Sequence, residues 1–123
     1  MNHARISIIF PVTGSENAAL QWSLDSILKQ TLPEIEVICV VSGSGHALAE
    51  TLRGYAERDE RIKIITLDEP QPDGGKNAGI AGASGEYLIF LDVGDCFSYN
   101  ACETMLNKAV LHHADAVKTG AVY

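Results

Sequence analysis

Basic residues are scarce in this sequence. Nine lysines and arginines stand against sixteen aspartates and glutamates, which gives a formal net charge of -7, and the basic residues are scattered along the chain. Binding to the phosphate backbone of DNA or RNA requires clustered cations. The composition therefore argues against a nucleic acid as the partner.

Long hydrophobic runs and paired cysteines are also missing. The apolar segment at residues 6–12 is interrupted by a serine and a proline, and it is far shorter than the ~20 residues of a membrane span. The sequence predicts neither a signal peptide nor a transmembrane helix. No CxxC pair occurs among Cys39, Cys96 and Cys102, which is typical of a reducing compartment. We therefore expect a cytoplasmic protein.

Motifs for zinc binding and for nucleophilic hydrolysis are absent as well. His112 and His113 are adjacent on an expected helix, so they point to different faces, and the sequence contains no HExxH motif. It also contains no Gly-x-Ser-x-Gly elbow, and neither Ser42 nor Cys96 has an identifiable histidine partner. Zinc enzymes and serine or cysteine hydrolases are therefore poor candidates.

Short strand-like runs are the main architectural signal. The 123 residues are 46% hydrophobic and 20% charged, which is typical of a globular protein, and we expect one domain over residues 1–123. Four short runs rich in β-branched residues predict strands that are buried on both faces. These runs lie at residues 5–10, 36–41, 61–66 and 86–91.

Helical spacing of apolar residues separates these strands. The predicted helices cover residues 20–28, 48–56, 76–83 and 102–109. Asn100 and Glu103 are expected to form a capping box for the last of them, and residues 115–122 predict a fifth strand. Strands that alternate with helices predict an α/β fold with a mostly parallel sheet and helices on both faces.

Candidate ligand-binding residues follow the strands, because open parallel sheets bind ligands at the carboxyl ends of their strands. The clearest case is residues 92–98, in which Asp92 and Asp95 come directly after the most hydrophobic run. Paired carboxylates suit a hard cation such as Mg²⁺ or Mn²⁺ that carries a phosphate group. The structural alternative is a turn in which Asp92 bonds nearby amides and Asp95 caps the next segment.

A glycine-rich segment, DGGKNAGI, is the second candidate. Gly74 and Gly75 allow close backbone approach, and a helix that begins near Lys76 would present free amides to an anion. The segment is not a P-loop, because Pro70 and Asn77 stand where that motif has Gly and Ser or Thr. The alternative is a solvated lysine beside a glycine loop.

Residues 43–48 (GSGHAL) form a third candidate, a partial dinucleotide fingerprint with Asp68 in the place of a ribose-binding acid. Leu48 replaces the third glycine, and the motif follows the second strand instead of the first. A turn with two glycines is a weak signal. The alternative is a tight turn in which Ser44 caps the next helix.

Taken in order, five segments carry a family resemblance: ISIIFPV, LDSILKQTLPEIEVICV, YAERDERIKII, KNAGIAGASGEYLIFLD and DCFSYNACETMLNKAV. With them the chain resembles the nucleotide-binding half of a family 2 glycosyltransferase with the GT-A fold. The resemblance implies a UDP-sugar donor, a Mn²⁺ or Mg²⁺ cofactor and inverting transfer of the sugar to an acceptor hydroxyl. It also implies that the acceptor-binding half, with the catalytic base, lies outside residues 1–123, so we assign no catalytic residue.

The resemblance also implies a set of site residues. Contacts to the nucleotide and diphosphate fall on Pro11, Val12, Ser42, Gly43, Lys76 and Asn77, and the metal ligands are Asp92 and Asp95. The sequence departs from the family pattern where Thr13 and Gly14 replace Tyr-Asn, Val41 and Ser42 replace Asp-Asp, Lys76 replaces Arg, and Gly94 replaces the middle acid of the metal motif.

These departures weaken the expected contacts to uracil, ribose and metal. We therefore expect weak or lost metal binding and keep a degenerate, non-catalytic binding or assembly module as the alternative function. A nicotinamide-dependent Rossmann protein is the third hypothesis. An oligomer is compatible with each of them.

Overall fold

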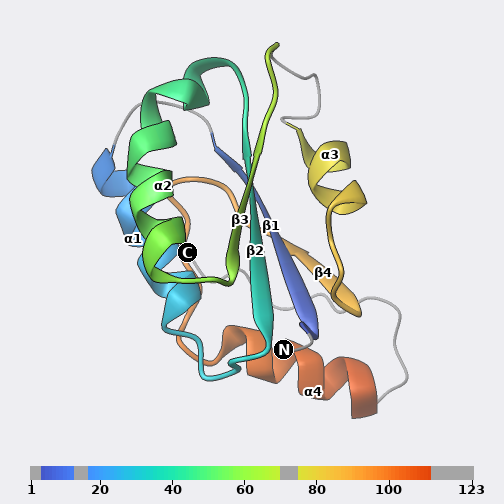
Figure 1. Ribbon diagram of the computed structural model, residues 1–123. Coiled ribbons are helices and arrows are strands. Elements are labelled where there is room, and N and C mark those ends of the chain that lie inside the picture. The colour runs from blue at the N-terminus through green and yellow to red at the C-terminus, as the bar shows by residue number, and fades with distance from the viewer. Residues whose placement is uncertain (1–3, 13–16, 70–74, 112–123) are drawn as a thin grey trace.

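The computed structural model describes residues 4–12, 17–69 and 75–111 (Figure 1). The elements in chain order are β1 (Ile6–Val12), α1 (Asn17–Leu28), β2 (Ile35–Val41), the 3-10 helix η1 (Gly43–Leu48), α2 (Ala49–Arg58), β3 (Ile62–Thr66), α3 (Lys76–Ala81), β4 (Tyr87–Phe90) and α4 (Ala101–Leu111). The predicted strand at residues 115–122 lies outside the described residues, as do His112 and His113. The other predicted helices and strands are present.

The four strands form one parallel sheet in the order β3-β2-β1-β4 (Figure 1). β1 lies inside the sheet, where Ile8 is opposite Val37 of β2 and Ile89 of β4. A helix lies between each pair of consecutive strands, because parallel strands need a long crossover connection. All the carboxyl ends of the strands therefore meet at one edge of the sheet.

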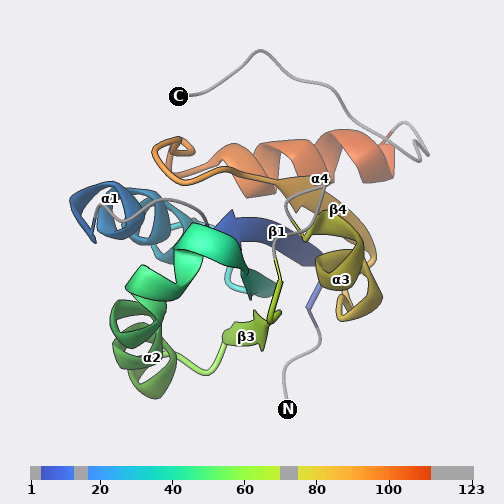
Figure 2. The ribbon, with the colours of Figure 1, turned by 90° about the horizontal axis from the view of Figure 1, so that it is seen from above.

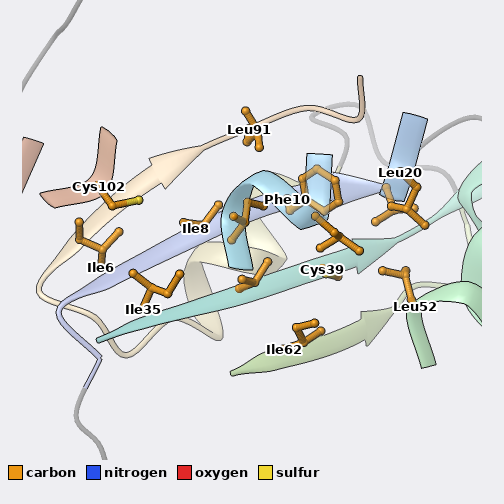
Figure 3. Packing of buried hydrophobic residues seen from close by; sticks show 14 of the residues in the cluster. Ile6, Ile8, Phe10, Leu20, Ile35, Cys39, Leu52, Ile62, Leu91 and Cys102 are labelled. Atoms are coloured by element: carbon orange, nitrogen blue, oxygen red, sulfur yellow. The ribbon is translucent and has the colours of Figure 1, made fainter. Parts of the chain in front are cut away.

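β1 and β2 bury side chains on both faces of the sheet. Alternate residues face α1, α2 and α4 and form the main core, in which Figure 3 shows Phe10 and Cys39. The intervening residues Ile9, Ile38 and Val40 pack on the face that α3 covers. Figures 1 and 2 show α1 and α2 on one side of the sheet and α3 on the other. The expected α/β sheet with helices on both faces is confirmed.

The two edge strands are less buried than predicted. Lys63 and Thr66 of β3 are exposed, and Leu88 and Phe90 of β4 are 40% and 46% exposed. Among the described strands, each edge strand has a single neighbour in the sheet, and the six-residue helix α3 packs over β1 and β2. A strand is buried on both faces only where helices cover both faces of the sheet. The run of apolar residues within a strand does not show how far the neighbouring helices extend.

Two corrections apply to the helices. The helix predicted over residues 76–83 ends at Ala81, because the N–H of Gly82 closes the last turn by donating to the carbonyls of Ala78 at 3.2 Å and Gly79 at 3.1 Å. The helix after residues 43–48 begins at Ala49, and η1 separates it from β2. The N-cap position of α2 is therefore Leu48 and not Ser44.

α3 packs so closely on the sheet that one of its positions requires glycine. A Cβ atom at Gly79 would lie 2.6 Å from Cγ2 of Ile9 and 3.2 Å from Cγ2 of Val40. We expect Gly79→Ala to lower the free energy of unfolding by about 1–3 kcal/mol, because the extra methyl group overpacks this contact. The matched control is Gly54→Ala in α2, where a Cβ atom would meet nothing within 4 Å.

Gly54→Ala is expected to raise the free energy of unfolding by about 0.5–1 kcal/mol, because alanine favours a helix interior. Urea denaturation of both variants measures the two effects. Equal effects at the two positions would contradict the close packing of α3 on β1.

A buried carboxylate fastens the connection between α3 and β4 to the sheet. Glu36 of β2 is only 4% exposed, and its Oε2 accepts hydrogen bonds of 2.5 Å from the backbone N–H of Ser84 and from the hydroxyl of Ser7. The Nζ of Lys63 lies 2.6 Å from its Oε1. Burial alone would raise the pKa of the Glu36 carboxyl, but these bonds outweigh burial and lower the pKa from 4.5 to about 2.

Candidate functional site

The predicted site residues lie around one edge of the sheet, where the strands end. Val12 at the end of β1 is opposite Val41 at the end of β2, and Thr66 ends β3 beside Val41. The backbone N–H of Leu91 donates to the carbonyl of Ile9 at 3.1 Å, so the chain that leaves β4 stays next to β1. Parallel strands place such ends at a common edge, which is where open α/β sheets bind ligands.

Pro11 and Val12 contribute little side-chain surface to this edge. Both residues are buried, and the side chain of Val12 belongs to the main core. A ligand that contacts them would do so through their backbone.

The end of β2 is closed to solvent in the same way. Val41 is fully buried in the main core, and Ser42 is 5% exposed. Gly43 has a φ of 53° and opens η1. A 3-10 segment therefore follows β2, in place of the direct turn into a helix that a dinucleotide fingerprint needs.

Gly75 and Lys76 bring α3 to the same edge. Gly75 has a φ of 90°, and a Cβ atom there would lie 2.5 Å from Cγ1 of Val40, so both conformation and space require glycine. Lys76 and Asn77 are exposed at the start of α3. The Nζ of Lys76 lies 5.8 Å from the ring centroid of Phe90, a cation–π distance. Lys76 is thus next to the end of β4.

Asp92 and Asp95 lie in one tight turn after β4. The backbone N–H of Asp95 donates to the carbonyl of Asp92 at 3.1 Å, and Gly94 supplies the positive φ of 98° that the turn requires. Asp92 is exposed and Asp95 half-buried. In the part of the chain that the structure describes, no protein group donates a hydrogen bond to either carboxylate. Capping by these side chains, the structural alternative, is therefore wrong for this turn.

The turn can hold a divalent cation only with help from other ligands. Among the described residues no group of three or more His, Cys, Asp or Glu side chains is placed to bind a metal ion. Mg²⁺ and its relatives commonly bind one or two carboxylates and complete their coordination with water and substrate phosphates. Two carboxylates that accept no hydrogen bond from residues 4–12, 17–69 and 75–111 fit that mode of binding.

The sequence did not reveal the residues that hold this turn in place. Gly94 donates its backbone N–H to the Oγ of Ser23 at 2.9 Å, and Ser23 is fully buried in α1. The one signal in the sequence was that Ser23, a polar residue, stands beside the apolar stripe of α1. The sequence alone does not show which distant backbone group such a residue meets.

Comparison with known proteins agrees with this fold. Residues 7–123 match the family described as Glycosyl transferase family 2. The chain belongs to glycosyltransferase family 2. The resemblance seen in the sequence is confirmed.

Two curated relatives illustrate how this family 2 domain compares with longer proteins. It is 35% identical to Glycosyltransferase GlyA of Streptococcus pneumoniae over 111 residues, which are 90% of this chain and 16% of GlyA. It is 35% identical to Poly(ribitol-phosphate) beta-glucosyltransferase of Bacillus spizizenii over 115 residues, which are 90% of this chain and 18% of that protein. The chain spans less than a fifth of the length of each.

A solved structure shows the same fold. S. aureus TarS 1-349 in complex with UDP matches with a TM-score of 0.79 at 24% identity, over 89% of this chain and 33% of that one. The family 2 domain therefore has the GT-A fold expected from the sequence. Within the described residues, no helix is both long enough and apolar enough to cross a membrane.

Proposed function

We propose that this family 2 domain binds the nucleoside diphosphate of a sugar donor, with UDP-sugar as the favoured donor. The observation that carries the proposal is the turn after β4, which presents Asp92 and Asp95 at the end of the sheet where the strands end, with no hydrogen bond to either carboxylate from the residues that the structure describes. The UDP complex of TarS, which shares the fold, is consistent with this donor.

Asp92 and Asp95 would hold a Mn²⁺ or Mg²⁺ ion. When bound, such an ion neutralises the negative charge of a diphosphate. The need for it is strong here, because a protein with a net charge of -7 repels an anionic ligand. Lys76, beside Phe90 at the end of β4, would place a further positive charge near the diphosphate.

The reaction we propose for the whole protein is inverting transfer of the sugar to an acceptor hydroxyl. A general base must reach that hydroxyl directly or through one water. We place the base outside residues 1–123, as the family resemblance implies. The chain spans less than a fifth of each of the two relatives named above. We therefore expect residues 1–123 to bind a donor without transferring its sugar.

The competing function is a degenerate, non-catalytic binding or assembly module. The buried side chain of Val41 favours it, because the acid that the family has at this position would contact the nucleotide. We call residues 92–95 the acidic turn. On this alternative the acidic turn binds no nucleotide.

Thermal melting separates the two functions. We expect UDP with Mn²⁺ to raise the melting temperature by several degrees at about ten times its millimolar Kd, where binding stabilises the fold by about 1.4 kcal/mol. The shift should vanish in Asp92→Asn. Glu57→Gln, which changes an exposed acid in α2, should keep it. No shift with UDP, ADP or GDP in the presence of Mn²⁺ would support the non-catalytic module.

A further inference from the structure

A row of polar side chains from α1 receives the loop that carries the acidic turn. The N–H of Gly94 donates to Oγ of Ser23 at 2.9 Å, and the N–H of Phe97 donates to Oγ of Ser26 at 3.2 Å. The side chain of Gln30 continues the row just after the helix. The loop and the helix are 71 positions apart in the sequence at the two serine contacts.

Gln30 fixes the far end of this loop. Its Oε1 accepts the N–H of Cys102 at 2.9 Å, in the first turn of α4, and its Nε2 donates to the carbonyl of Ser98 at 2.6 Å. The backbone N–H of Thr31 donates to the carbonyl of Tyr99 at 2.8 Å. The loop from the acidic turn to α4 is thus held along its length by α1 and the residues just after it.

Ser23 is the member of this row that touches the acidic turn itself. The turn begins after Leu91, whose N–H donates to the carbonyl of Ile9. Val93 packs against the main core, and the N–H of Gly94 donates to Ser23. A Cβ atom at Gly94 would meet nothing within 4 Å, so the bond to Ser23 holds Gly94 itself, while the core contact belongs to the neighbouring Val93.

We propose that Ser23 is a positioning residue for a divalent-cation site formed by Asp92 and Asp95. Its buried hydroxyl holds Gly94, which lies between the two acids, and so sets how their carboxylates stand relative to each other. Mg²⁺ and Mn²⁺ demand a regular ligand geometry, and groups that orient metal ligands commonly change metal affinity by about 10- to 100-fold. The inference rests on the proposed function.

Ser23→Ala tests the role against a matched control, Ser26→Ala. Each substitution removes one α1 hydroxyl that binds one N–H of the same loop, but only Ser23 meets the acidic turn. The readout is the metal-dependent gain, defined as the Kd of UDP without metal divided by its Kd with Mn²⁺, both by calorimetry with the 123-residue chain.

The gain should fall about tenfold in Ser23→Ala and stay at the wild-type value in Ser26→Ala. The Kd of UDP without metal should not change in either variant, and the two should lose melting temperature to a similar extent. In an Asp95→Asn background, Ser23→Ala should have no further effect on the gain, because the site it positions is already lost.

Three results would overturn the role of Ser23. The first is an equal metal-dependent gain in Ser23→Ala and Ser26→Ala. The second is a further tenfold loss of the gain when Ser23→Ala is added to Asp95→Asn. The third is a wild-type chain that binds UDP equally well with and without Mn²⁺. The last result leaves nucleotide binding standing without a cation site. A wild-type chain that binds no UDP under either condition would instead overturn the proposed function, and with it the role of Ser23.

Discussion

Replacing Val41 with aspartate should lower the free energy of unfolding by about 3–5 kcal/mol, because it places an uncompensated charge in the core. Val41 is fully buried and faces the main core at the end of β2. A loss of this size is a large part of the stability of an ordinary domain. Urea denaturation at neutral pH measures it.

Thr66→Asp is the matched control for this substitution. Thr66 lies opposite Val41 in the neighbouring strand but is exposed, so a carboxylate there should change stability by no more than about 0.5 kcal/mol. If Val41→Asp were as stable as the wild type, the new side chain would have left the core. A single substitution at position 41 would then restore the acid expected from the family resemblance without loss of stability. We do not expect this result.

Acid should weaken the fold through Glu36. The folded-state pKa of this carboxyl is about 2 against an ordinary value of 4.5, so its contribution is complete above pH 4.5 and is lost as the pH falls towards 2. The shift corresponds to about 3 kcal/mol between neutral pH and pH 2. Denaturant unfolding across this range should therefore show a flatter pH dependence in Glu36→Gln.

Glu86→Gln is the control for the acid experiment. Glu86 makes an exposed ion pair with Arg5 at 3.2 Å, and such pairs contribute about 0–1 kcal/mol. Its pH profile should follow the wild type. A Glu36→Gln profile as steep as that of the wild type would show that the bonds from Lys63, Ser7 and Ser84 do not stabilise the charged carboxylate.

The strands and helices could be predicted because their signals are local. The apolar runs that became β1 and β2, and the spaced leucines of α1, report burial through neighbouring positions of the same element. The exposure of Leu88 and Phe90 could not be predicted in this way, because it depends on how far α3 reaches across the sheet.

The candidate site was only partly predictable for a related reason. The acids at 92 and 95 stand out directly after a strand, and the structure places them in one turn as expected. The contact of Ser23 with Gly94 joins residues 71 positions apart, so it becomes visible only when the fold is known. The burial of Val41 likewise depends on the helices that pack above it.

Calorimetric titration of UDP into the 123-residue chain, with Mn²⁺ and again with EDTA, tests the central claim most directly. We predict millimolar binding with Mn²⁺ and binding at least about tenfold weaker with EDTA, since charge-assisted contacts contribute about 1.5–3 kcal/mol each. The double variant Asp92→Asn, Asp95→Asn should behave with Mn²⁺ as the wild type does with EDTA. Equal UDP affinity in all of these titrations would contradict a cation-dependent nucleotide site at this turn.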